Sequence, residues 1–203
     1  MKPDDKARSQ RRILLQALAA APLASLSGAA LITPAVLRAQ PTPQCADSDE
    51  PTPGQTAGPF YKPRSPQRVS LLDAGMRGEA LVVTGFVLST SCKPVAGAVL
   101  DFWHCDSRGN YDNSGFRFRG HQFTGADGGF RLETLIPGLY PGRTRHIHVK
   151  VQAPNRPVLT TQLYFPGEPD NSRDFIFRPE LLMKLAEATE RKLARFDFVV
   201  DLG

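Results

Sequence analysis

Short segments of mainly apolar residues recur along the chain from residue 80 onwards, and glycine and proline separate these segments. Valine, leucine and aromatic residues dominate the segments, which is the composition of β-strands. In the last segment Phe196, Phe198 and Val200 share one face, and Asp197 and Asp201 occupy the other. The pattern predicts strands at Ala80–Leu88, Ala98–Trp103, Phe130–Leu135, His146–Gln152, Leu159–Phe165 and Phe196–Leu202.

One segment has the composition of a helix instead. Pro179 suits a first helical position, and Glu180 to Leu193 consists mainly of Leu, Lys, Ala, Glu and Arg, which are good helix formers. Leu182, Leu185 and the alanines supply one apolar side. The sequence therefore predicts a mainly β protein, a β-sandwich of short strands with a site carried on its loops and one helix near the C-terminus. A hydrophobic content of 41% in 203 residues suits a single domain with a core.

The first 39 residues differ from the rest of the chain. A basic region ends in Arg11-Arg12 and precedes a weakly apolar run, which resembles a twin-arginine export signal cleaved after Ala39. An uncleaved membrane anchor is the alternative, but proline, serine and glycine interrupt the run, and an anchor needs about 20 unbroken apolar residues. We expect a periplasmic or secreted protein, with a signal at 1–39, an extended proline-rich arm at 40–68 and a β-sandwich domain at 69–203.

The net charge of +5 does not indicate a nucleic-acid partner. Residues 1–39 carry six basic and two acidic side chains, so the rest of the chain has a net charge of only +1. A polyanion needs a clustered basic face, and this balance supplies no excess to build one. We expect no nucleic-acid partner, and no stable membrane insertion once the signal is cleaved.

The chain has three cysteines, Cys45, Cys92 and Cys105, which fit an oxidising compartment. Cys92 and Cys105 flank one predicted strand, whose apolar core spans roughly 20 Å, whereas a disulfide joins Cα atoms about 6 Å apart. These two are therefore not expected to pair. Cys45 on the arm is the better candidate partner for either of them, and no spacing matches a zinc pattern.

The sharpest local pattern is His146-Ile147-His148. On a strand the two imidazoles project to the same side, about 7 Å apart at the backbone, while Ile147 and Val149 enter the core. Two imidazoles on one face can bind one metal ion, although two solvated surface histidines would give the same pattern. Tyr140 and Arg143 lie in the loop just before His146, and Tyr111 follows the strand that ends at Trp103.

Two phenols and two imidazoles form a hard, anionic donor set that suits a trivalent ion, whereas zinc more often takes thiolate, imidazole or carboxylate ligands. Each tyrosine could equally be a turn or packing residue in its loop. Phe102 and Trp103 are expected in the core. His104 and His121 are expected to be hydrogen-bonded polar residues at strand ends, and Arg145 to be solvated.

Several ordered motifs resemble the intradiol ring-cleavage dioxygenases, which include the catechol and protocatechuate enzymes, and most of all their small exported branch with a twin-arginine signal. They cover most of residues 52–203 and lie at Thr52–Tyr61, Pro94–Ala98, Trp103–Tyr111, Phe118–Gln122, Pro137–His148 and Leu159–Gln162. Within the first of them, Pro59 and Tyr61 are candidates to line a pocket.

The resemblance implies a bound Fe(III), with Tyr111, Tyr140, His146 and His148 as its ligands. Tyr140 would leave the metal when substrate binds and take a proton from the substrate. Arg143 and Gln162 would lie beside the substrate ring. The implied reaction incorporates both atoms of O2 into a catechol-type ring between its two hydroxylated carbons, giving a muconate-type dicarboxylic acid.

The substrate's ring substituents and the oligomeric state stay open at this point. Arg117, Arg119 and Arg143 could favour a carboxylated ring, and the arm could reach a second copy in a homo-oligomer. A rival interpretation is also open, because Lys93–Ala98 and Asp127–Tyr140 resemble transthyretin-like and carboxypeptidase-regulatory β-sandwiches, which are non-catalytic binding modules. The tyrosines, histidines and Arg143 favour the enzyme, since a binding module has no need of them.

Overall fold

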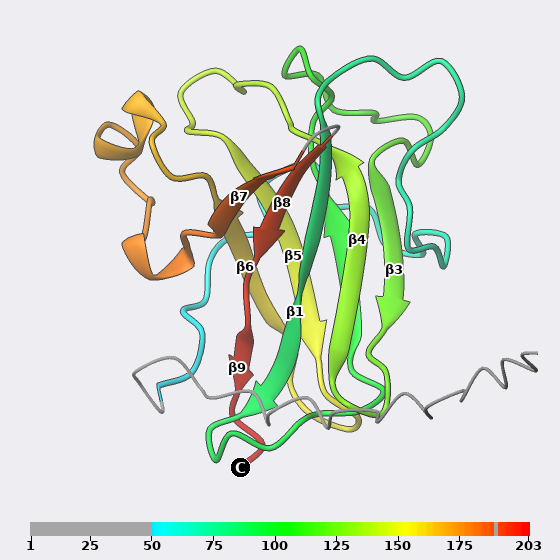
Figure 1. Ribbon diagram of the computed structural model, residues 1–203, viewed down its shortest axis with the longest axis vertical. Coiled ribbons are helices and arrows are strands. Elements are labelled where there is room, and N and C mark those ends of the chain that lie inside the picture. The colour runs from blue at the N-terminus through cyan, green and yellow to red at the C-terminus, as the bar shows by residue number, and fades with distance from the viewer. Residues whose placement is uncertain (1–49, 189–190) are drawn as a thin grey trace, which may run out of the picture. The chain divides into compact units, whose positions relative to one another are not determined.

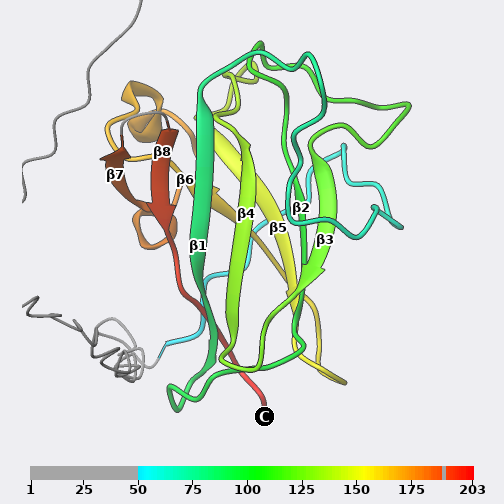
Figure 2. The same ribbon diagram turned by 45° about the vertical axis from the view of Figure 1, so that its right-hand side comes forward.

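Two β-sheets face each other in this computed structural model, which describes residues 50–188 and 191–203 (Figure 1 and Figure 2). One sheet has the strand order β3-β2-β5-β6, and the other has the order β4-β1-β8-β7 with β9 paired to β1. The strands are β1 (Ala80–Ser89), β2 (Val99–Trp103), β3 (Arg119–Phe123), β4 (Gly129–Leu135), β5 (His146–Gln152), β6 (Leu159–Tyr164), β7 (Lys184–Ala188), β8 (Arg191–Arg195) and β9 (Phe198–Val200). Two 3-10 helices, η1 (Pro169–Ser172) and η2 (Pro179–Leu181), lie between β6 and β7 along the chain. The predicted β-sandwich is confirmed.

The core fills the space between the sheets with alternate residues of their strands. Ile147 and Val149 of β5 are fully buried, as their alternation with the histidines predicts. They belong to one apolar cluster with Phe102 of β2 and Val83 of β1. Because the inward residues of β5 anchor the strand in this cluster, its outward residues are held at fixed positions.

The register of the β3-β2-β5-β6 sheet brings polar residues of three strands together. His148 of β5 lies opposite both Trp103 of β2 and Gln162 of β6, and His146 lies opposite Tyr164. Opposite residues in antiparallel strands project to the same face. These side chains therefore gather at the end of the sheet where β2 and β6 finish and β5 begins.

The predicted helix from Glu180 to Leu193 is wrong. A single 3-10 turn begins at Pro179, and β7 and β8 follow as an antiparallel pair. β8 also pairs in parallel with β1, and burial follows a period of two, since Ala194 is 3% exposed and Leu193 is 40% exposed. Helix propensities differ by only about 0.7 kcal/mol per residue, which the hydrogen bonds and burial along β1 outweigh.

Two other elements differ from the pattern. β3 is not predicted, because its sequence RGHQF contains a single apolar strand former, Phe123. The last strand is shorter than Phe196–Leu202, because the chain crosses β1 closely at Phe196. Phe196 N donates to Thr84 O, and a Cβ on the adjacent Gly85 would overlap the Phe196 carbonyl group. β8 and β9 therefore pair with β1 on either side of this crossing.

The segment from residue 50 to residue 68 contains no strand and lies along the sandwich. Thr52 N donates to Val199 O at 2.8 Å, and Val199 N donates to Thr52 Oγ1 at 2.8 Å. Further along, Gln55 N donates to Thr160 O at 2.7 Å. These bonds fix residues 52–56 against β9 and β6 and lead the following residues towards the histidines of β5.

The cysteines agree with the expectation that Cys92 and Cys105 do not pair. Cys105 is a free, buried thiol, and Cys92 is disulfide-bonded. Cys45 and the predicted export signal lie outside the described residues. Within residues 50–188 and 191–203, no helix is long and apolar enough to cross a bilayer.

Candidate metal centre

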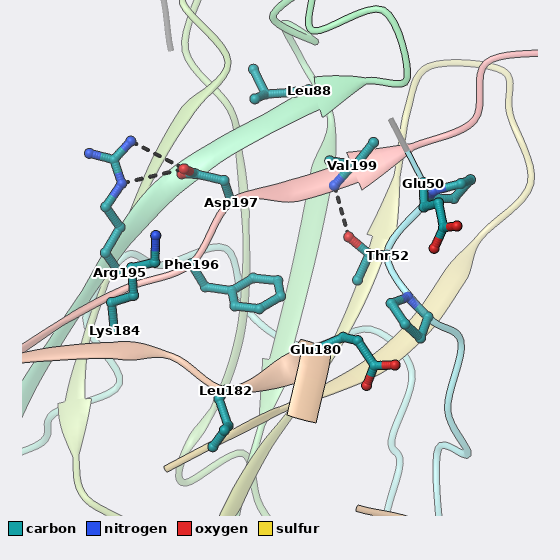
Figure 3. Close-up of a pocket in the computed structure, with 12 residues that line it drawn as sticks. Glu50, Thr52, Leu88, Glu180, Leu182, Lys184, Arg195, Phe196, Asp197 and Val199 are labelled. Carbon is teal, nitrogen blue, oxygen red and sulfur yellow. Dashed lines mark hydrogen bonds and ion pairs between the residues drawn. The ribbon is translucent and has the colours of Figure 1, made fainter. Parts of the chain in front are cut away.

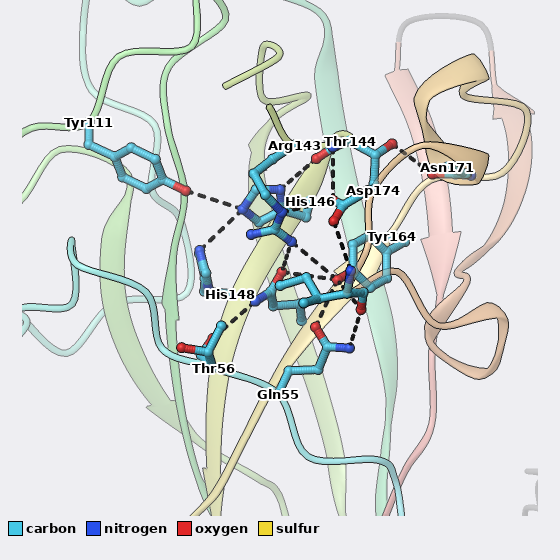
Figure 4. A network of polar contacts seen from close by, with 12 residues as sticks. Gln55, Thr56, Tyr111, Arg143, Thr144, His146, His148, Tyr164, Asn171 and Asp174 are labelled. Atoms are coloured by element: carbon cyan, nitrogen blue, oxygen red, sulfur yellow. Dashed lines mark hydrogen bonds and ion pairs between the residues drawn. The ribbon is translucent and has the colours of Figure 1, made fainter. Parts of the chain in front are cut away.

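Three of the predicted ligand atoms converge at one point (Figure 4). His146 Nε2 lies 3.2 Å from His148 Nε2, and Tyr111 Oη lies 3.4 Å from His146 Nε2. The histidines are the first and third residues of β5 and are buried. Tyr111 comes from the loop between β2 and β3. Because residues two apart on a strand share a face, the sequence spacing alone sets the histidine pair.

This spacing fits one shared metal ion. Metal–nitrogen bonds are about 2.0–2.1 Å long, so two ligands at right angles lie roughly 3 Å apart. In the described part of the chain, no group of three His, Cys, Asp or Glu side chains could hold a metal. The further donor that the structure brings to the two histidines is the phenol oxygen of Tyr111, 3.4 Å from His146 Nε2.

The protein prepares both imidazoles in the neutral form that a metal binds. His146 Nδ1 donates to Thr144 O at 2.6 Å, which leaves a lone pair on Nε2. Burial lowers the pKa of His146 to about 4 even with this hydrogen bond. Burial, with His146 close by, also lowers the pKa of His148 well below its ordinary value. Neither ring is charged at neutral pH.

Packing orients the ring of His148. Trp103 stacks on it with the ring centroids 4.8 Å apart and the planes 3° from parallel. His148 Nδ1 is buried and has no hydrogen-bond partner among the described residues. Gly58 lies against the ring, since a Cβ there would lie 3.6 Å from His148 Cε1. The orientation of this imidazole is therefore set by packing against the indole and the arm, and not by a hydrogen bond to its Nδ1.

Tyr111 is a half-buried phenol stacked on Phe60 of the arm, with ring centroids 4.3 Å apart. Burial raises the pKa of Tyr111 far above its ordinary value, and the charges of Arg143 and Arg119 oppose the rise only in part. Such a phenol ionises at neutral pH only when a strong cation stabilises its oxygen. Its environment is suited to a metal-bound phenolate and to no free one.

Tyr140 lies beside these three residues. Its ring centroid is 5.8 Å from that of Tyr111 and 5.4 Å from that of Phe60, both in edge-on arrangements. No hydrogen bond to another described residue holds its hydroxyl group. The structure therefore brings Tyr140 into the cluster through ring contacts, without a polar contact to either histidine.

Arg143 and Tyr164 lie in a polar network next to the histidines (Figure 4), and Gln162 belongs to the same network. Arg143 Nη2 donates to Gln162 Oε1 at 2.7 Å and to Tyr164 Oη at 3.3 Å. Tyr164 Oη in turn donates to Gln55 Oε1 on the arm at 2.8 Å. The two residues predicted to lie near a substrate, Arg143 and Gln162, are thus in direct contact with each other.

The family model described as "Dioxygenase" matches residues 56–202. The chain belongs to the intradiol ring-cleavage dioxygenase family. It is 32% identical over 167 residues to catechol 1,2-dioxygenase 1 of Acinetobacter lwoffii, covering 67% of this chain and 54% of that protein. It is 33% identical over 141 residues to the protocatechuate 3,4-dioxygenase beta chain of Burkholderia cepacia, covering 59% and 57%. The chain spans about half the length of these curated relatives.

Solved structures of the family show the same fold. The dioxygenase domain of a dioxygenase carbohydrate-binding protein fusion from Streptomyces sp. SirexAA-E is 58% identical, with a TM-score of 0.74 over 76% of this chain and 100% of that domain. Hydroxyquinol 1,2-dioxygenase from Pseudomonas putida DLL-E4 is 25% identical, with a TM-score of 0.68 over 77% of this chain and 68% of that one. The whole of the Streptomyces domain is thus matched by this intradiol dioxygenase family member.

Several residues of the site are missing from the sequence prediction. Tyr164 could have been found, because it lies two residues after Gln162 and so on the same face of β6. Phe60 stands inside a predicted motif, yet nothing in the sequence indicates that it stacks on Tyr111. Asp174, which pairs with Arg143 at 2.8 Å, lies in a loop that shares no pattern with the strands.

Other predicted residues lie outside the site. The ring nitrogens of His104 are taken up by Cys105 O and Thr134 Oγ1, and His121 Nδ1 contacts Ser65 O at 2.7 Å. Both histidines are therefore hydrogen-bonded polar residues, as expected. Tyr61 donates to Asp101 rather than to any ligand.

The expectation of a solvated Arg145 is wrong. Its Nε donates to Glu168 Oε1 at 2.7 Å, and its Nη1 donates to the carbonyl group of Pro137. Arg117 is exposed, and the donors of buried Arg119 are taken up by main-chain carbonyl groups. Of the three arginines considered for a carboxylated ring, only Arg143 therefore lies in the site.

A separate hollow of about 230 Å³ lies between the arm, η2, β7 and β9 (Figure 3). Its charged wall includes Arg195, which pairs with Asp197 at 3.1 Å. Thr52 and Val199 bond to each other across one side of it. None of the predicted site residues lines this hollow, so the candidate chemistry is confined to the end of the sheet that holds the histidines.

Proposed function

We propose that this protein is a non-haem Fe(III)-dependent intradiol dioxygenase, which cleaves a catechol-type ring with O2 between its two hydroxylated carbons. The product is a muconate-type dicarboxylic acid that contains both oxygen atoms. The observation that carries the proposal is the convergence of Tyr111 Oη and the Nε2 atoms of His146 and His148 within 3.2–3.4 Å. Tyr140 is proposed as the fourth ligand.

The residues of the site have distinct roles in this proposal. Bound Fe(III) would withdraw electrons from the coordinated ring and make it reactive towards O2. The buried imidazoles stay neutral, so they bind the metal without competing protons. Tyr111 holds its position through its stacking contact with Phe60, and it would supply the lasting anionic oxygen.

Tyr140 is suited to a movable role, because no described residue holds its hydroxyl group. We propose that its Oη takes a proton from one substrate hydroxyl group as substrate binds, which makes Tyr140 the general base of the reaction. Tyr140 would be a phenolate beside bound Fe(III), and by taking this proton it would become a neutral phenol and leave its place to the substrate oxygen. Ring contacts with Tyr111 and Phe60 keep the displaced phenol nearby.

Arg143 would stabilise the negative charge that develops on the ring in this water-poor pocket. Gln162 accepts a hydrogen bond from Arg143 and donates one to Thr56 O at 3.0 Å. It therefore ties the guanidinium group to the arm, and the substrate would lie between Arg143 and the ligand atoms.

The rival binding-module function has no support in the described residues. A non-catalytic β-sandwich needs no pair of neutral, buried histidines beside a half-buried phenol. The proposed compartment is the periplasm or the exterior, reached through the twin-arginine signal at residues 1–39. The proposed partners are a small catechol-type substrate and O2.

The test is the metal content and visible spectrum of the purified protein, before and after catechol is added in air. We expect about one iron per chain, a reddish colour from phenolate-bound Fe(III), and a shift of the absorption with catechol while O2 is consumed. The matched control is the H148A variant, which should stay folded and lose iron. A folded, colourless wild-type protein that takes up no supplied Fe(III) would refute the proposal.

A further inference from the structure

The carboxylate of Asp174 is buried beside the proposed active site, and the proposed function assigns it no role. Its side chain is 1% exposed. Asp174 Oδ2 accepts hydrogen bonds from Arg143 Nε at 2.8 Å and from Thr144 N at 3.0 Å, and its Oδ1 accepts one from Ile176 N at 3.2 Å. Burying a carboxylate costs free energy unless it is paired and hydrogen-bonded. These three contacts offset that cost for Asp174.

The contacts of Arg143 determine which way its guanidinium group points. Asp174 binds the Nε edge, and Gln162 and Tyr164 bind Nη2. No hydrogen bond to a described residue uses Nη1. Because the guanidinium group is planar and rigid, hydrogen bonds that fix Nε and Nη2 also fix the direction in which Nη1 points.

The segment that carries Asp174 is itself attached to the chain around Arg143. Thr144 Oγ1 donates to Asn171 Oδ1 at 2.7 Å, and Arg145 pairs with Glu168 at 2.7 Å. Two ion pairs thus join residues 143–145 to residues 168–174. The two arginines point to different places. Arg143 donates to Gln162 and Tyr164, whereas Arg145 donates to Pro137 O.

We propose that Asp174 is a positioning residue that holds Arg143 with Nη1 directed at the substrate ring. Asp174 acts through Arg143 and does not touch the reacting atoms. The inference rests on the proposed function, because it assumes that a substrate ring occupies the space beside Arg143. It further implies that the second ion pair, between Arg145 and Glu168, contributes to the fold and not to turnover.

The experiment compares D174N with E168Q, which removes the charge of the neighbouring ion pair on the same segment. In D174N we expect iron content and colour to stay at the wild-type level, and kcat to fall between about tenfold and a hundredfold from misplacement of Arg143. E168Q should keep the wild-type kcat. Catechol titrated without O2 reports binding through the visible spectrum, independently of turnover.

A double-mutant cycle separates positioning from a general structural effect. If Asp174 acts through Arg143, D174N should change kcat little further when R143A is already present. D174E, which keeps the charge, should recover part of the lost kcat. Additive losses in the double variant, or equal losses in D174N and E168Q, would overturn the inference while leaving the proposed function in place. A wild-type protein without iron or O2 uptake would instead overturn both.

Discussion

The chemistry of single residues in this site depends on burial more than on charge pairs. His146 and His148 are neutral because desolvation disfavours their charged forms, and His146 is also held in one tautomer by Thr144 O. Tyr111 is a phenol in an apolar, aromatic surrounding, so its ionised form needs a cation next to it. Each of these proposed ligands is therefore poor as an isolated ion and well suited to a metal.

Replacement of the stacked phenol tests this view. The Y111F variant keeps the ring contact with Phe60 and removes only the oxygen. We therefore expect it to fold and to lose iron to a chelator at least about tenfold faster than wild type. Its visible absorption should also weaken. The control is Y61F, because Tyr61 bonds to Asp101 outside the site. Equal iron loss in Y111F and in wild type would remove Tyr111 from the ligand set.

A second residue-scale prediction concerns His104, a buried histidine without a proposed ligand role. Burial lowers the pKa of His104 to about 4, so between pH 6.5 and pH 4 the unfolded chain takes up a proton that the folded protein does not. His104 therefore contributes stability above pH 6.5 that is lost as the pH falls. At pH 5 the loss is about 2 kcal/mol.

Denaturant unfolding of the iron-free protein at pH 7.5 and pH 5 measures this loss. The H104Q variant cannot titrate, so its free energy of unfolding should depend less on pH than that of wild type by about 2 kcal/mol over this range. Identical pH dependences in the two proteins would contradict the burial argument. The absolute stability of H104Q does not enter the comparison.

At the scale of elements, two buried or half-buried cations join the arm to the loop that carries Tyr111. Arg119 of β3 is 1% exposed and donates to Phe60 O at 2.6 Å and to Asp112 O at 3.1 Å and 3.2 Å. Lys62 of the arm donates to Ser114 O and Gly115 O at 3.0 Å and 2.7 Å. The bonds of Arg119 thus fix the two segments next to Tyr111, which are the main chain at Phe60 and the main chain at Asp112.

Removal of Arg119 should therefore affect the fold and the site together. R119M leaves the carbonyl groups of Phe60 and Asp112 without partners, and each buried unpaired group costs about 1–3 kcal/mol. We expect a free energy of unfolding lower by about 2 kcal/mol or more. The matched control is R117M, two residues away and exposed, which should change it by less than about 0.5 kcal/mol. Similar values for the two variants would show that the hydrogen bonds of Arg119 to Phe60 O and Asp112 O do not stabilise the fold.

On the scale of the whole molecule, the β3-β2-β5-β6 sheet, its loops and the arm supply the site residues, and the second sheet supports them through the core. Ile147 and Val149 are buried against residues of β1 and β4, so the inward half of β5 holds the outward histidines in place. The arm closes the site through Gln55, Thr56 and Phe60. A site assembled in this way needs the folded domain before it can bind a metal.

Assembly before export is what the twin-arginine signal would permit, and it yields a prediction about the full chain. Expressed in a bacterium with that export route, the protein should be recovered from the periplasm with Gln40 as its first residue. The double variant R11K/R12K should remain in the cytoplasm at its full mass. Fractionation and mass spectrometry measure both outcomes, and export of the double variant would refute the assignment of the signal.

Much of the fold and part of the site follow from local patterns. A period of two marks β4 and β5, and composition marks β1 and β6. The period of β5 puts His146 and His148 on one face. The motifs also single out Tyr111, which the fold brings to His146, and Arg143 and Gln162, which the fold brings into contact with each other. Local patterns cannot reveal Phe60 or Asp174 as site residues, because their contacts join segments far apart in the sequence.

The sequence by itself determined the β-sandwich, the paired histidines and the family, because strand periodicity and short motifs are local properties of the chain. Only the tertiary structure decided that residues 184–195 form strands, since pairing with β1 outweighs a weak preference for helix. It also decided that Arg143 is held between Asp174 and Gln162. Those outcomes depend on hydrogen bonds and burial between distant segments, whose free energies exist only once the sheets have packed.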